Sequence, residues 1–95
     1  MKQLIILPVA RQEVLDIWDY SFENWGQEQA DRYLAALDAM FARIANGSAP
    51  SRSADELRPD LRKVLVARHV VFFRENAEVV EVVRVLHERM DVGRV

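Results

Sequence analysis

The chain has 95 residues, which is enough for one small domain, and its 51% hydrophobic and 29% charged content excludes an intrinsically disordered protein. It contains no cysteine, so neither a disulfide framework nor a cysteine-based metal site can form. The net charge of −2 argues against a domain whose main task is to bind nucleic-acid phosphates, although the nine basic residues of 51–95 leave room for a local basic patch.

The first element expected is a strand over residues 2–7, because an apolar run begins at Leu4 and is interrupted by Pro8. The run is too short for a signal peptide, since Arg11 and Glu13 follow at once. There is also no stretch of about 18 apolar residues for a membrane span. Together with the cysteine-free composition, this leads us to expect a cytoplasmic protein.

Two helices are expected next, over residues 8–25 and 27–46. Pro8 is favourable in the first turn of a helix, Gly26 ends the first periodic segment, and Asn46-Gly47 ends the second. Because so little chain separates the two segments, the helices should fold back as an antiparallel hairpin. Their apolar side chains recur at spacings of three and four residues: Ala10, Val14, Ile17, Trp18, Phe22 and Trp25 in the first, and Ala30, Tyr33, Leu34, Leu37, Phe41 and Ile44 in the second.

The second helix is apolar around more than half of its circumference, because Ala36, Ala39 and Met40 lie beside its main stripe. One interpretation is that alanine is simply a good helix former. The other is that these residues form a second contact surface, and the sequence leaves both interpretations open.

Residues 47–60, rich in Ser, Pro, Ala and Asp, are expected to form a connecting loop. The periodicity then changes to that of strands, and the tight turn at Asn76-Ala77 implies antiparallel neighbours. We therefore predict a single α+β domain over residues 1–95, with an N-terminal strand, an antiparallel helix hairpin and a three-stranded antiparallel meander in one sheet. The three strands of the meander are expected at residues 61–67, 69–75 and 78–87.

The last predicted strand is apolar on both faces. Strict alternation places Val79, Val83 and Val85 on one face and Val80, Val82 and Leu86 on the other. The helix hairpin can cover one face of the sheet, so the other face should lack cover, at a cost of roughly 1.5–3 kcal/mol for each exposed side chain. We expect a partner protein to supply that cover; the alternative is that strand ends and the C-terminal tail fold over it.

Catalytic and metal chemistry find little support in the sequence. The two histidines, His69 and His87, and scattered carboxylates give a weak metal signal, and neither a glycine-rich phosphate loop nor a nucleophile elbow is present. In a regular strand Arg84 and His87 would point to opposite faces, so we do not expect them to converge. No cofactor is expected.

Several arginines fall in or beside the predicted sheet, where their guanidinium groups could bind phosphates or carboxylates. A nearly equal number of acidic residues accompanies them, which favours ion pairs or an acidic partner segment over nucleic acid. The residues in question are Arg58, Arg62, Arg74, Arg84 and Arg89.

Motifs along nearly the whole chain resemble the ParE family within the RelE/ParE toxin superfamily. Each motif alone is modest, but their order and spacing together are specific. They are Leu7-Pro8-x-Ala10, Glu13-Val14-x-x-Ile17-Trp18-x-Tyr20, Trp25-Gly26, Ala30-x-x-Tyr33-x-x-x-Leu37, Leu57-Arg58-x-x-Leu61-Arg62, His69-Val70-Val71-Phe72-Phe73-Arg74 and Val83-Arg84-Val85-Leu86-His87-x-Arg89-Met90-Asp91.

The resemblance implies the toxin of a type II toxin–antitoxin system, of the kind used in plasmid maintenance, which inhibits DNA gyrase by binding rather than by catalysis. It also implies a ParD-like antitoxin, with a ribbon-helix-helix DNA-binding N-terminus and a C-terminal segment that wraps the toxin, so that DNA is contacted only through the antitoxin. The residues expected to contact the target lie in the C-terminal segment: Arg84, His87, Arg89, Met90 and Asp91. The residues expected to bind the antitoxin are Trp18, Phe22, Leu34, Met40, Arg62, Phe72, Arg74 and Val82.

RelE-like relatives provide the alternative, a ribosome-dependent endonuclease that cuts messenger RNA. Arg62, Arg84 and His87 would then stabilise and protonate phosphate oxygens. The tail after His87 has no tyrosine and few basic residues, and the sequence pI of about 5.6 does not suit a ribosome binder. These features favour the gyrase inhibitor.

Overall fold

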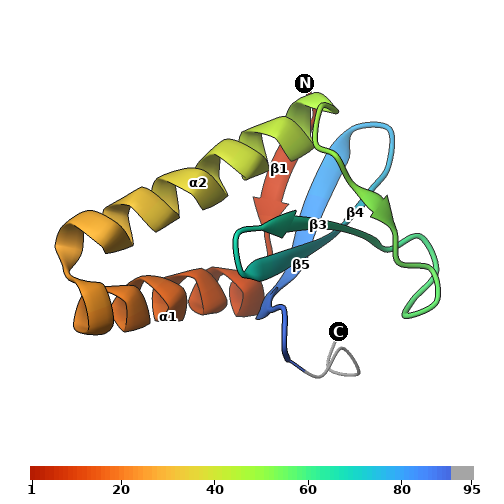
Figure 1. Cartoon of the computed structure of the whole chain (residues 1–95). Coiled ribbons are helices and arrows are strands. Elements are labelled where there is room, and N and C mark those ends of the chain that lie inside the picture. The colour runs from red at the N-terminus through yellow and green to blue at the C-terminus, as the bar shows by residue number, and fades with distance from the viewer. Residues whose placement is uncertain (91–95) are drawn as a thin grey trace.

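The computed structural model describes residues 1–90 and places a helix hairpin against a five-stranded sheet (Figure 1). This is the α+β order predicted from the sequence, with one additional short strand. The elements are β1 (Gln3–Ile6), α1 (Pro8–Trp25), α2 (Gln27–Asn46), β2 (Arg52–Ser53), β3 (Arg62–Val66), β4 (His69–Glu75) and β5 (Val79–His87). Within the described residues, neither helix is long and apolar enough to cross a membrane.

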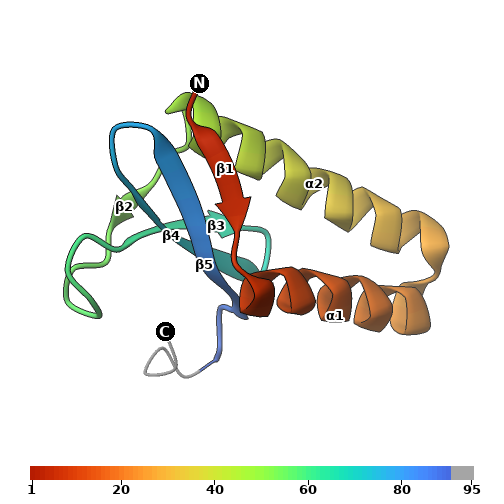
Figure 2. The ribbon, with the colours of Figure 1, turned by 180° about the vertical axis from the view of Figure 1, so that it is seen from behind.

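The ends of the two helices follow from proline and glycine. Pro8 begins α1, where its missing N–H would have had no partner within the helix. Gly26 and Gly47 adopt φ angles of 88° and 82°, which side chains with a Cβ rarely adopt, and they end α1 and α2. The hairpin is therefore confirmed, and Figures 1 and 2 show the turn between α1 and α2 at the end furthest from the strands.

The sheet has the strand order β1-β5-β4-β3-β2. Strands β3, β4 and β5 form the predicted antiparallel meander. Strand β1 adds to it in parallel with β5, with Gln3 opposite Val79 (Figure 2). Strand β2, which pairs with β3, was not predicted, because its two residues are too few to show an alternating pattern.

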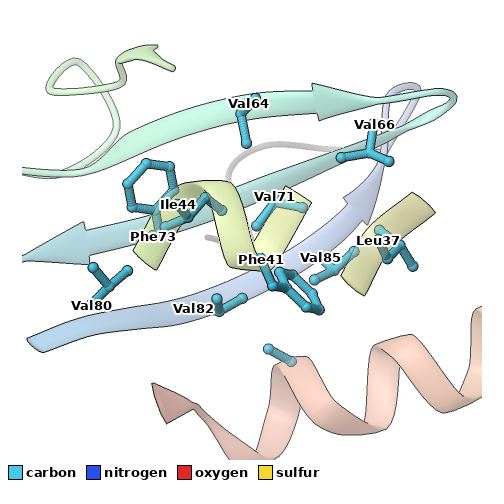
Figure 3. Packing of buried hydrophobic residues seen from close by; sticks show 11 residues of the cluster. Leu37, Phe41, Ile44, Val64, Val66, Val71, Phe73, Val80, Val82 and Val85 are labelled. Atoms are coloured by element: carbon cyan, nitrogen blue, oxygen red, sulfur yellow. The ribbon is translucent and has the colours of Figure 1, made fainter. Parts of the chain in front are cut away.

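The main core lies between α2 and one face of the sheet (Figure 3). Leu37, Phe41 and Ile44 of α2 point at the strands and are at most 3% exposed. They occur at spacings of three and four residues, as a helix that buries one face requires. The strand residues opposite them are Val64, Val66, Val71, Phe73, Val80, Val82 and Val85.

The other face of the sheet is covered by the chain itself, so the expectation that a partner must cover it is wrong. Ala54, Leu57 and Leu61, from the segment between β2 and β3, pack on Phe72 and Leu86 of the sheet. Backbone hydrogen bonds hold this segment in a compact turn, including Ala54 N–H to the Leu61 carbonyl at 2.8 Å. Sequence reasoning treated the segment as a simple connection and therefore missed its apolar residues as cover.

A register shift in β5 explains a second discrepancy. Phe72 pairs with Arg84 and Phe73 with Val82, so Val83 is an extra residue without a partner on β4. Val83 therefore packs in the second cluster while Val85 packs in the main core, although strict alternation had placed both on one face. Leu86 likewise lies on the face opposite that of Val80 and Val82.

Candidate binding surfaces

An open groove of about 1070 Å³ lies between α1, the beginning of α2, the β3–β4 turn and the end of β5. Its lining is largely apolar and aromatic, with Tyr20 and Trp25 at 61% and 64% exposure on the helix side. These two rings contact each other edge to face, with centroids 5.7 Å apart. Such a mixture of exposed apolar surface and a few polar groups is typical of a binding site.

A clamp formed by Glu13 and Arg84 fixes one wall of the groove. The Arg84 Nη2 and Nε atoms donate to Glu13 Oε2 at 2.7 and 3.0 Å, and the Val85 N–H donates to Glu13 Oε1 at 2.9 Å. The hydrogen bond to the Glu13 carboxylate raises the pKa of Arg84 above its ordinary value. The clamp thus ties α1 to β5 just past the bulge, and it satisfies a backbone N–H at the strand edge.

A histidine pair, His69 and His87, also lines the groove. The Tyr33 hydroxyl shares a short hydrogen bond with His69 Nδ1, and the His69 and His87 rings meet edge to face with centroids 5.3 Å apart. The His87 Nδ1 atom accepts the Arg89 N–H at 3.1 Å. Burial, and secondly the nearby His87, lower the pKa of His69 below 6.5, with Glu88 opposing them.

Because His69 resists protonation, the structure favours a neutral imidazole there at neutral pH. Burial also disfavours the charged form of Tyr33 and so raises the pKa of its hydroxyl, which accepts the Arg68 N–H at 3.2 Å. Within residues 1–90 no three histidine or carboxylate side chains gather as metal ligands. The pair thus links α2, through Tyr33, to the β3–β4 turn and the end of β5.

Comparison with known proteins identifies the family. The protein-family model described as the ParE toxin of the type II toxin–antitoxin system, parDE, matches residues 4–92. The chain belongs to the ParE toxin family. This confirms the family predicted from the motifs.

Named ParE toxins resemble the chain over nearly its whole length. Toxin ParE1 of Mycobacterium tuberculosis is 40% identical over 91 residues, covering 95% of this chain and 93% of that protein. Toxin ParE of Escherichia coli is 38% identical over 93 residues, covering 97% and 90%. A solved structure of the chromosomal ParDE system from P. aeruginosa shares the fold, with a TM-score of 0.75, 18% identity, and coverage of 92% and 96%.

The residues that the ParE resemblance assigned to target contact lie mainly around the groove. Arg84, His87 and Met90 line it, and Arg89 is exposed next to it. The pairing register keeps Arg84 and His87 on opposite faces of β5, but Arg84 bends round the open strand edge towards α1. Both side chains therefore reach one groove, contrary to expectation, while Asp91 lies outside the described residues.

The residues assigned to antitoxin binding do not form one surface. Phe72 and Val82 are 2% and 0% exposed, so they belong to the core and offer nothing to a partner. The reason is that the chain covers both faces of the sheet: Phe72 packs with the segment between β2 and β3, and Val82 packs in the main core with α2. Met40 packs on the main core, Arg62 donates to Ser51, and Arg74 pairs with Glu81 at 2.8 Å.

The remaining three, Trp18, Phe22 and Leu34, lie on the outer side of the helix hairpin. Trp18 and Phe22 stack with centroids 5.2 Å apart, and Phe22 is 45% exposed. Leu15, one turn earlier on the same face of α1, is 54% exposed and was not predicted. We call these four residues the hairpin stripe.

Sequence reasoning also missed Glu13 and Tyr33 as organisers of the groove. Glu13 falls on the charged side of an amphipathic helix, where a carboxylate normally faces solvent. Tyr33 falls on the apolar stripe of the second helix and was counted as core. The only available signal was their place in the family motifs, because a contact between residues 13 and 84 leaves no local pattern.

Proposed function

We propose that this ParE-family protein inhibits DNA gyrase by binding it, without catalytic turnover, and that a ParD-like antitoxin neutralises it in the cytoplasm. Membership of the family supports this proposal. The groove at the end of β5 supports it as well, because Arg84, His87 and Met90 present a mixed polar and apolar surface there. Contact with Arg89 and with Asp91 would extend that surface along the chain.

One observation carries the choice of binding over RNA cleavage: Arg62 lies apart from Arg84 and His87, so the RelE-like set does not converge on one site. Arg62 pairs with Phe73, whereas His87 pairs with His69, which lies four residues earlier on β4. Four residues of a strand span about 13 Å, and β4 itself separates the two side chains. General acid–base catalysis requires groups within hydrogen-bond reach of one reacting phosphate.

The arginines are also engaged with the chain itself. Arg84 is bound by Glu13, and Arg62 donates to the Ser51 hydroxyl at 2.9 Å and to the Ser51 carbonyl at 3.1 Å. A phosphate that recruited these guanidinium groups would have to compete with contacts already made. This arrangement argues against phosphate binding by either arginine, while the part of Arg84 that stays exposed still lines the groove.

Antitoxin binding is proposed at the hairpin stripe. Leu15 and Phe22 leave about half of their side chains in water, and Trp18 extends the same surface. Contiguous exposed apolar side chains are typical of protein–protein contact sites. The antitoxin would carry the ribbon-helix-helix DNA-binding part, so that DNA is reached only through it.

The deciding experiment compares two assays on the purified protein. We expect inhibition of gyrase supercoiling, with no ribosome-dependent cleavage of messenger RNA. Replacement of the exposed Arg89 and Met90 by serine should weaken inhibition while leaving the fold intact, and Arg58→Ser in the β2–β3 segment is the matched control. Cleaved message with normal supercoiling would overturn the proposal.

A further inference from the structure

The hairpin stripe is bordered by carboxylates on both helices. On α1, Asp19 and Glu23 follow Trp18 and Phe22 by one residue each. They therefore lie beside the stripe, on the side that faces away from the core. On α2, Asp31 and Asp38 lie one turn before and one turn after Leu34. All four carboxylates are on exposed residues. The apolar surface is therefore set in an acidic frame.

Few positive charges offset this frame. The hairpin from Pro8 to Asn46 carries seven acidic and three basic side chains. Arg32 is paired with Glu28 at 2.8 Å, and Arg43 donates to the Ser48 carbonyl near the end of α2. The third cation, Arg11, lies one turn before Leu15 near the beginning of α1. Within residues 1–90, neither Asp19, Glu23 nor Asp38 has an ion-pair or hydrogen-bond partner.

The stripe is also held in one conformation. The Trp18 indole N–H donates to Asp31 Oδ1 at 3.0 Å, across the seam between the two helices, and the Trp18 ring stacks on Phe22. Both contacts reduce the rotamer freedom that binding would otherwise have to remove. The surface is thus organised before any partner arrives.

The secondary structure of the occupant follows from the backbone. Both helices satisfy their own N–H and C=O groups, so this face offers no strand edge to an extended peptide. A third helix, by contrast, can lie along two packed helices and place apolar residues at spacings of three and four into their seam. The acidic frame would attract basic residues on either side of that apolar face.

We propose that the hairpin stripe binds an amphipathic helix whose apolar face is flanked by arginine or lysine. This inference rests on the proposed neutralisation by an antitoxin, and it assigns that chemistry to the antitoxin segment that contacts the hairpin. The acidic frame favours the matching helix and repels segments with acidic flanks.

The test begins with the protein encoded by the gene next to this one, co-expressed with the full chain. If that protein neither binds nor suppresses toxicity, the proposed neutralisation itself fails. If it does, peptides of about 20 residues tiled along its sequence are titrated against the purified chain. We expect the tightest peptide to become helical on binding and to carry Arg or Lys beside its apolar face.

Two variants then examine the surface. Phe22→Ser should weaken the tightest peptide by about thirtyfold, as for an interface hot spot. The triple variant Asp19→Asn, Glu23→Gln, Asp38→Asn should weaken it by about two- to fivefold per charge, with a smaller dependence on salt than the wild type. Asp31 is left unchanged because it holds Trp18.

Matched controls lie elsewhere on the surface: Leu65→Ser replaces a leucine that is 56% exposed on β3, and Glu78→Gln removes a carboxylate from the β4–β5 turn. Both should leave the affinity unchanged. Unaltered affinity in the triple variant, or a tightest peptide that is extended or flanked by acids, would overturn the inference while leaving neutralisation in place.

Discussion

Replacing Leu61 by alanine tests whether the segment between β2 and β3 is a true part of the core. Leu61 is 2% exposed and packs with Phe72, Val83 and Leu86 on the face of the sheet opposite the helices. A buried Leu→Ala change costs 2–5 kcal/mol through lost burial and the remaining cavity. Because this cluster is small and lies under a loop that can partly collapse, we expect about 3 kcal/mol.

That loss is large relative to the roughly 5–15 kcal/mol that stabilises a domain of this size. With an m-value of about 1.5 kcal/mol/M, the urea midpoint should fall by about 2 M at unchanged m. Far-UV circular dichroism and tryptophan fluorescence would both report it, because Trp18 and Trp25 are in the hairpin and follow global unfolding.

Leu65→Ala is the matched control, since Leu65 is the same residue type in the neighbouring strand but is 56% exposed. It should cost less than about 0.5 kcal/mol. If Leu61→Ala proved as mild as this control in the isolated chain, the segment would not cover the sheet. The second face would then need cover from a partner after all.

Three further predictions concern an ion pair, a titrating histidine and a backbone conformation. Glu13→Ala should cost about 2–3 kcal/mol in urea unfolding, because the Arg84 guanidinium and the Val85 N–H both lose their acceptor, whereas Glu13→Gln should cost about half as much. Since the pKa of His69 is lower in the folded chain, the unfolded chain binds the extra proton, and urea midpoints should fall as the pH drops below 6.5. Ala67→Gly should raise stability by about 0.5–1 kcal/mol in the same assay, because φ at Ala67 is 52°.

Each of these expectations has an outcome that would contradict it. Equal losses for Glu13→Ala and Glu13→Gln would show that charge, not the hydrogen bond to the backbone, holds the clamp. A His69→Asn variant should respond less to pH than the wild type, and an equal response would place the titration elsewhere. Ala42→Gly, on the exposed side of α2, should lower the stability by about 1 kcal/mol. If this variant were also more stable than the wild type, the backbone explanation at Ala67 would be wrong.

The helices and the meander could be predicted because their signals are local. Pro8, Gly26 and Gly47 mark helix ends through backbone geometry alone, and the predicted bounds of β4 match those observed. The parallel pairing of β1 with β5 carries no such signal, because Gln3 and Val79 meet only in the folded chain. The N-terminal strand and the meander were predicted to share one sheet, but neither the neighbour of β1 nor the parallel direction of its pairing was predicted.

The candidate site was less predictable for the same reason. Alternation along β5 fails at Val83, where one extra residue shifts the register. Val85 and Leu86, which follow the shift, were therefore assigned to the wrong face. Phe72 and Val82 were taken for surface for another reason, because the cover that the chain itself gives to both faces was not foreseen. Trp18 and Phe22, which were counted in the apolar stripe of the first helix and assigned to antitoxin binding, are half-buried and 45% exposed, respectively, and their assignment to antitoxin binding stays a prediction.

The parallel pairing of β1 with β5 determines when the fold can form relative to translation. During synthesis the first strand emerges long before Val79–Val82, the segment that it pairs with in the sheet, has been translated. Until then α2 lacks Val80, Val82 and Val85 as packing surface, and such sequence-distant contacts are slow to form. A nascent or prematurely terminated chain therefore cannot acquire the mature shape, so the cell should encounter an active molecule only after translation has passed the final strand.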